Sequence, residues 1–182
     1  MTNEGLDLSC GSHFTFRTLV EAGETWHRLR VPNLPSQPET WTAIRQLTTT
    51  ILDPVVEQFG SLKLTYGFAS PALARRISHN IDPSRDQHAG HELHPDGRPV
   101  CSRLGQAVDF FVEGACSAQI AAWVAAYLPF DRLYFYGSDK PIHVSVGPQN
   151  SRAIVEMSRG PSGRRIPQRR TLPWLISRHG AS

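Results

Sequence analysis

Several features of exported and membrane proteins are missing from this sequence. It has no run of about 18 apolar residues, so a membrane-spanning helix is excluded. Its first residues are not basic and lead into no apolar stretch, so we expect no secretory signal peptide and a cytoplasmic protein. The three cysteines, Cys10, Cys101 and Cys116, are an odd number, whereas a disulfide framework normally has an even one. A reducing environment is therefore expected.

Internal repeats and low-complexity tracts are also absent. Of the 182 residues, 40% are hydrophobic and 19% are charged, which is typical of a globular chain and not of a disordered one. The length suits one domain with a core and a tail. We expect a domain over residues 1–158, followed by an arginine-rich segment over residues 159–182.

Lysine is absent from the last 32 residues, and Glu156 is their single acid. Seven arginines give this segment a net charge of +6, whereas residues 1–150 carry −3. Arginine suits planar, bidentate partners such as phosphate, so a nucleic acid or an acidic protein surface is the expected partner. The candidate nucleic-acid contacts are Arg159, Arg164, Arg165, Arg169 and Arg170. A solvated tail, or one folded back on the acidic body, is the structural alternative.

The clearest helix is expected over residues 39–59, where apolar residues recur every three or four positions, with a kink or division at Pro54. One helix or two short ones are expected over residues 14–29. Further helices are expected over residues 71–77 and 117–128. The expected strands are residues 62–66, 107–112, 133–136, 142–146 and 152–157. This order predicts an α+β fold, with a mainly antiparallel sheet and flanking helices.

Five short segments, in register, resemble the M15-type zinc D-Ala-D-Ala carboxypeptidases. They are residues 13–16 (HFTF), 56–60 (VEQFG), 64–73 (LTYGFASPAL), 105–109 (GQAVD) and 142–146 (IHVSV). The resemblance implies the small α+β sheet that this family shares with the Hedgehog signalling domain. It also implies a zinc ion held by a His, an Asp and a second His, with a Glu as general base.

Residue by residue, the resemblance assigns the Asp ligand to Asp109 and the last His ligand to His143. The family's first His lies seven residues before the Asp, where this chain has Ser102. At the position nearest to the family's Glu this chain has Tyr136. Serine is a poor zinc ligand at neutral pH, so a third ligand must come from elsewhere.

Two sources of that third ligand are open. Cys101 is adjacent to the lost position and could supply a thiolate. The loop over residues 79–105, long enough to suggest a function, offers His88 or His91, with Glu92 as the base. Arg103 either pairs with Asp109 or binds an anionic ligand. Each candidate also has a purely structural interpretation, namely a packed or surface histidine, a solvated Glu92 or a buried thiol.

Three functions of different classes follow. The first is a cytoplasmic domain of this fold that no longer cleaves cell-wall peptides and is associated with nucleic acid. Residues 133–145 also resemble proteins that accompany DNA phosphorothioation systems, which implies a role in DNA modification or phage defence. The second is an active zinc hydrolase or peptidase, for example of the endolysin type. The third is a structural subunit whose arginine-rich end docks on another protein.

Overall fold

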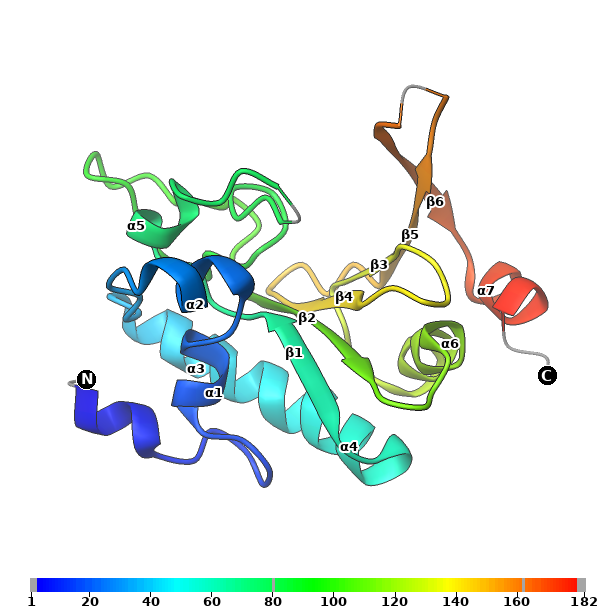
Figure 1. Ribbon diagram of the computed structural model, residues 1–182, viewed down its shortest axis with the longest axis horizontal. Coiled ribbons are helices and arrows are strands. Elements are labelled where there is room, and N and C mark those ends of the chain that lie inside the picture. The colour runs from blue at the N-terminus through cyan, green and yellow to red at the C-terminus, as the bar shows by residue number, and fades with distance from the viewer. Residues whose placement is uncertain (1–2, 80, 162, 180–182) are drawn as a thin grey trace.

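The computed structural model describes residues 3–79, 81–161 and 163–179 as an α+β fold with one open six-stranded sheet (Figure 1). The strand order across the sheet is β1-β2-β4-β3-β5-β6. Neighbouring strands are antiparallel except β3 and β5, which are parallel. The predicted α+β class with a mainly antiparallel sheet is therefore confirmed. The strands are β1 (Leu62–Tyr66), β2 (Gln106–Val112), β3 (Arg132–Phe135), β4 (Ile142–Val146), β5 (Ala153–Arg159) and β6 (Arg165–Arg170).

The two faces of the central strands differ because side chains alternate along a strand. Apolar residues of β2, β3 and β4, such as Val108, Leu133 and Val144, belong to the hydrophobic core. Asp109, Tyr134 and His143, each next to one of these in the chain, therefore lie on the opposite face. One face of the sheet holds the core, and the other holds the polar side chains.

The core face is covered by the helices α3 (Pro38–Leu47), α4 (Asp53–Phe59) and α6 (Ser117–Tyr127). The helix expected over residues 39–59 is divided, because a π-helical turn, η2 (Thr48–Leu52), separates α3 from α4. Pro54 follows this turn and has no N–H to donate, so the regular α-helical bonding cannot run through it. Of the kink or division expected at Pro54, the structure shows a π-helical interruption that ends just before this proline.

The remaining N-terminal helices are short. They are η1 (Asn3–Asp7), α1 (Phe16–Val20), α2 (Glu24–Leu29) and α5 (Pro71–Ala74). Of the two alternatives expected for residues 14–29, the structure has two short helices, and Gly23, at a φ of 104°, makes the break between them. α5 is shorter than the predicted 71–77. Within the described ranges, no helix has both the length and the apolar character needed to cross a bilayer.

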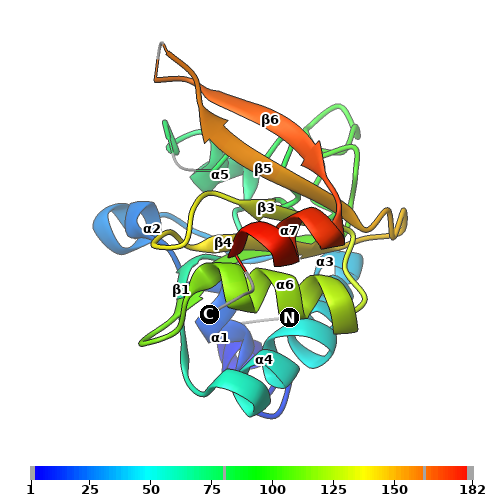
Figure 2. The same cartoon turned by 90° about the vertical axis from the view of Figure 1, so that its right-hand side faces the viewer.

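The C-terminal arginines belong to the folded domain. β6 pairs with β5 along its whole length, and a last helix, α7 (Leu172–His179), packs on α6 (Figure 2). Leu175 of α7 is fully buried in the core. The boundary expected at residue 158 therefore falls inside β5. The edge strand β6 was not expected from the sequence, because its arginine-rich residues show no clean apolar alternation.

The long loop between α5 and β2 is ordered by buried polar side chains. The Gln87 side chain donates from Nε2 to the Leu104 carbonyl at 2.7 Å and to Asp131 Oδ2 at 2.9 Å. Its Oε1 accepts from Ser145 Oγ of β4 at 2.7 Å. Gln87 has a left-handed φ of 69°. These bonds hold the centre of the loop against the polar face of the sheet.

Candidate metal centre

Asp109 and His143 are direct partners across the β2–β4 pairing. Opposite residues of antiparallel strands lie about 5 Å apart, so their side chains meet on one face. The His143 Nδ1 and Asp109 Oδ1 atoms are 2.8 Å apart, and both side chains are buried. The two residues that the family resemblance selected therefore form one contact.

His88 joins this pair from the long loop. Its Nε2 lies 3.3 Å from Asp109 Oδ1, and its Nδ1 lies 2.7 Å from the Gly67 carbonyl oxygen. The Ala69 N–H donates to the His88 carbonyl at 2.9 Å, which fastens the loop backbone beside the end of β1. The backbone contact at Nδ1 fixes the ring so that Nε2 faces the carboxylate.

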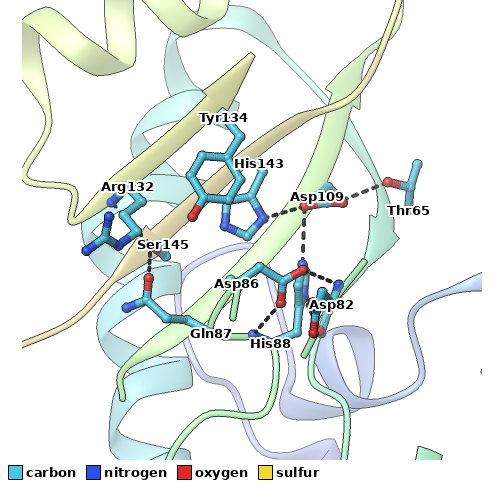
Figure 3. Close-up of polar contacts among 12 residues, drawn as sticks. Thr65, Asp82, Asp86, Gln87, His88, Asp109, Arg132, Tyr134, His143 and Ser145 are labelled. Carbon is cyan, nitrogen blue, oxygen red and sulfur yellow. Dashed lines mark hydrogen bonds and ion pairs between the residues drawn. The ribbon is translucent and has the colours of Figure 1, made fainter. Parts of the chain in front are cut away.

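His88, Asp109 and His143 form a compact group of metal-binding donors, with one ligand atom from each lying within 4.8 Å of the others. Figure 3 shows Asp109 between the two histidines, with dashed contacts to both. Among the described residues this is the sole such group of three or more. Two imidazoles and one carboxylate are a common set of three protein ligands for catalytic zinc.

The charges of the group depend on one another. Burial alone would lower the pKa of His88, but the negative charges of Asp86 and Asp109 outweigh it and raise that pKa to about 9. Burial alone would raise the pKa of Asp109, but its contacts with His88 and His143 hold it well below its usual range. Without a metal, the carboxylate is therefore ionised and His88 carries a proton on the nitrogen that faces it.

The other two expected ligands lie outside the group. His91 Nε2 accepts a hydrogen bond from the Gly105 N–H at 3.0 Å, and the ring lines a separate, smaller pocket beside α3. Cys101 is fully buried as a free thiol and offers no ligand atom to the group. Of the two loop histidines proposed from the sequence, His88 is the one that lies beside Asp109 and His143.

The expected role of Glu92 as a base at this site is corrected by its contacts. Its carboxylate accepts hydrogen bonds from the backbone N–H groups of Ser36 and Gln37 and from the hydroxyls of Ser36 and Thr40. These groups lie at and just before the start of α3. Glu92 therefore anchors the loop to the beginning of α3, where a negative charge is favourable.

Arg103 does not pair with Asp109 but holds a tyrosine at the centre. Its Nη1 donates to the Tyr134 hydroxyl oxygen at 2.8 Å and also contacts the Arg85 carbonyl. The Tyr134 ring stacks on the His143 ring, with centroids 4.5 Å apart and planes 14° apart. Arg103 thus acts on the centre through Tyr134.

A cavity of about 1130 Å³ opens over the polar face of the sheet. Residues of the long loop form one wall and residues of the β5–β6 hairpin form the opposite one, while α2, β1 and the β3–β4 turn contribute further lining residues. Asp109 and Tyr134 line the cavity, while His88 and His143 lie almost fully buried behind them. Ligands in the cavity therefore reach the group from the Asp109 side.

Two further residues of the cavity were not selected from the sequence as site residues. Asp86 lines it, and its carboxylate accepts hydrogen bonds from the backbone N–H of His88 at 3.4 Å and from that of Asp82 at 2.6 Å.

Tyr136 also lines the cavity, and its ring lies beneath the Arg165 guanidinium. Burial first, and then the charges of Asp109 and Asp86, raise the pKa of Tyr136, so its hydroxyl remains a donor. The one sequence signal for Tyr136 was its alignment with the family's Glu.

The five arginines selected as nucleic-acid contacts separate into two groups. Arg159 and Arg165 line the cavity. Arg170 pairs with Glu156 at 2.8 Å, and Arg164 and Arg169 are exposed on the hairpin outside the cavity lining.

Comparison of the chain with family models, with curated proteins and with solved structures found no match.

Proposed function

We propose that the protein is a zinc-dependent hydrolase with a fold of the Hedgehog/D-Ala-D-Ala carboxypeptidase kind. The observation that carries the proposal is the convergence of His88, Asp109 and His143 at the base of an open cavity. The three come from a loop and two strands that are separated in sequence. His88 takes over the ligand role that Ser102 cannot fill, so the proposal favours an active hydrolase over a domain without chemistry.

The donor set fits zinc on three observations. Two histidines and a carboxylate supply the donor types that zinc prefers. His88 is oriented by the Gly67 carbonyl, which is the usual outer contact of a metal-bound imidazole. Among the described residues, the buried His143 Nε2 has no hydrogen-bond partner, so this nitrogen is available to a metal ion. Bound zinc would supply a water activated near neutral pH and would polarise the scissile group.

The residues around the metal ligands have separate tasks. Asp86 lines the cavity close to His88, and its position there assigns to it the role of proton acceptor in the place of the missing Glu. The Tyr134 hydroxyl accepts from Arg103, so its own proton is free to be donated into the cavity. The protonated Tyr136 is a second donor. Such donors stabilise negative charge that develops on a substrate oxygen.

The experiment measures zinc in the purified protein and in two matched variants. We expect about one zinc per chain after reconstitution, loss of zinc in His88→Ala, and retention in His91→Ala, which removes a nearby histidine of the same loop. Hydrolysis of a D-Ala-D-Ala peptide and of bis(p-nitrophenyl) phosphate is assayed in parallel. Turnover of either one that is lost in His88→Ala supports the proposal.

Failure to bind zinc, or equal loss of zinc in both variants, would overturn the proposed function. Turnover of the D-Ala-D-Ala peptide would identify cell-wall peptides as the substrate class. It would also overturn the expectation that the domain has moved away from cell-wall cleavage.

A further inference from the structure

The cavity over the sheet concentrates positive charge. Of the residues that the structure describes, seven lysines and arginines line it, against four aspartates and glutamates. The first 150 residues carry more acids than bases, so this is a local excess that the composition of the body does not explain. A cavity lined by one sign of charge attracts ligands of the opposite sign.

Two of these charges face each other without a counter-ion. Arg159 and Arg165 are directly opposite residues in the β5–β6 pairing, and both line the cavity. Neither has a carboxylate partner within the part of the chain that the structure describes. Like charges directly opposite on neighbouring strands destabilise a hairpin. An anion between them would remove that repulsion.

Arg103 supplies a cation from the opposite wall. It lines the cavity from the long loop, and among the described residues its guanidinium bonds to oxygen atoms of uncharged groups alone, Tyr134 Oη and the Arg85 carbonyl. Its positive charge is therefore not neutralised by a carboxylate. Unneutralised arginines on both walls suit a ligand with repeated negative charges better than one with a single charge.

Aromatic rings lie between the two walls. Tyr134 and Tyr136 of the β3 region line the cavity, and both are partly exposed. The Arg165 guanidinium carbon lies 4.6 Å from the centre of the Tyr136 ring. Unpaired bases stack on tyrosine rings and on arginine planes, whereas bases inside a duplex present only their edges. An acidic peptide would form ion pairs with the arginines but has no bases to stack on the tyrosine rings.

We propose that this cavity binds a single-stranded nucleic acid, with phosphates at Arg159, Arg165 and Arg103 and with bases against Tyr134 and Tyr136. The cavity volume of about 1130 Å³ is above the usual range for a small-molecule site, which suits a segment of a polymer. This binding goes beyond the proposed hydrolysis and does not depend on it.

The test is the binding of a fluorescently labelled, mixed-sequence DNA strand, compared with its duplex and with poly-glutamate, to the full chain. We expect the strand to bind more tightly than the duplex, and more weakly as salt rises. In the double variant Arg159→Gln/Arg165→Gln, the slope of log affinity against log salt should fall by about 0.7 for each arginine removed.

The matched control is Arg164→Gln/Arg169→Gln, which removes the same charge from the same hairpin outside the cavity. We expect its affinity and salt slope to stay near those of the unmodified protein. Circular dichroism of both variants checks that the hairpin remains folded. In addition, Tyr136→Leu should weaken binding of the strand more than binding of the duplex.

Equal losses in the two double variants would show that general charge on the hairpin, and not the cavity, binds the strand, and would overturn the proposal. Binding of poly-glutamate as tightly as DNA would overturn it in favour of an acidic protein partner. All of these assays are repeated in EDTA. Strand binding that persists in EDTA would show that it needs no metal. Strand binding by a protein that takes up no zinc on reconstitution would support this proposal and overturn the proposed hydrolase. Zinc binding without strand binding would overturn this proposal and leave the proposed hydrolase standing.

Discussion

The Tyr134 ring lies flat against the His143 ring, with centroids 4.5 Å apart. The same tyrosine is held at its hydroxyl by Arg103. The stacking fixes a proposed zinc ligand through a residue that donates no ligand atom itself. Tyr134 therefore combines two tasks, orienting His143 and presenting a hydroxyl to the cavity, and single substitutions separate them.

The variant Tyr134→Phe keeps the ring and removes the hydroxyl. We expect it to retain zinc and to lower kcat, because a donor to the substrate is lost while His143 stays in place. Tyr134→Ala removes the stacking as well and should weaken zinc binding by about 10- to 100-fold, as the loss of an outer contact usually does. Competition with a chromogenic chelator measures the affinity. Equal zinc affinities in the two variants would show that the stacking does not position the ligand.

Zinc affinity should rise with pH up to about pH 9. The pKa of His88 is raised to about 9 in the metal-free protein, so at neutral pH zinc must displace a proton from this ring. As the pH falls below that pKa, competition from the proton lowers the zinc affinity progressively. Calorimetric titration at pH 7.5 in two buffers of different ionisation enthalpy measures the protons released per zinc. Zinc binding without proton release at that pH would contradict the charge state assigned to His88.

Glu92→Gln should destabilise the fold without affecting zinc. The change removes the charge from a buried carboxylate that accepts hydrogen bonds from Ser36, Gln37 and Thr40. Charge-assisted hydrogen bonds contribute about 1.5–3 kcal/mol each, and the amide keeps part of the set, so we expect a loss of about 2–4 kcal/mol. Urea unfolding measures the stability and elemental analysis the zinc content. A variant that keeps its stability but loses zinc would show that Glu92 takes part in the metal centre.

Thiol reagents should modify Cys116 first. The part-burial of this thiol raises its pKa, but hydrogen bonds from the Ala118 and Gln119 backbone N–H groups and from Ser138 lower it by more. Burial raises the pKa of Cys10, and Cys101 is fully buried. Because the thiolate is the reactive form, brief treatment with iodoacetamide followed by mass spectrometry should find the label at Cys116. The variant Cys116→Ser should lose the fast reaction. Fast labelling of Cys101 would show that the long loop opens in solution.

Local sequence patterns predicted much of the secondary structure. The apolar spacing over residues 39–59 predicted the main helix, and Pro54 predicted a kink or division within it, because both depend on neighbours within a few residues. β6 and α7 were missed for the opposite reason. The six residues of β6, from Arg165 to Arg170, include three arginines and a proline, and they form a strand because β5 supplies their hydrogen-bond partners.

The sequence by itself determined the candidates of the metal centre: Asp109 and His143 through a family resemblance, and His88 as one of several residues in a polar loop. Only the tertiary structure chose among them. Gln87 links the loop to β4, and Gly67 orients the His88 ring toward Asp109, while His91 and Glu92 turn to α3 and its surroundings. Residues three or four positions apart in an irregular loop have no fixed relative direction. The long-range hydrogen bonds of their neighbours therefore decide which side chains reach the sheet.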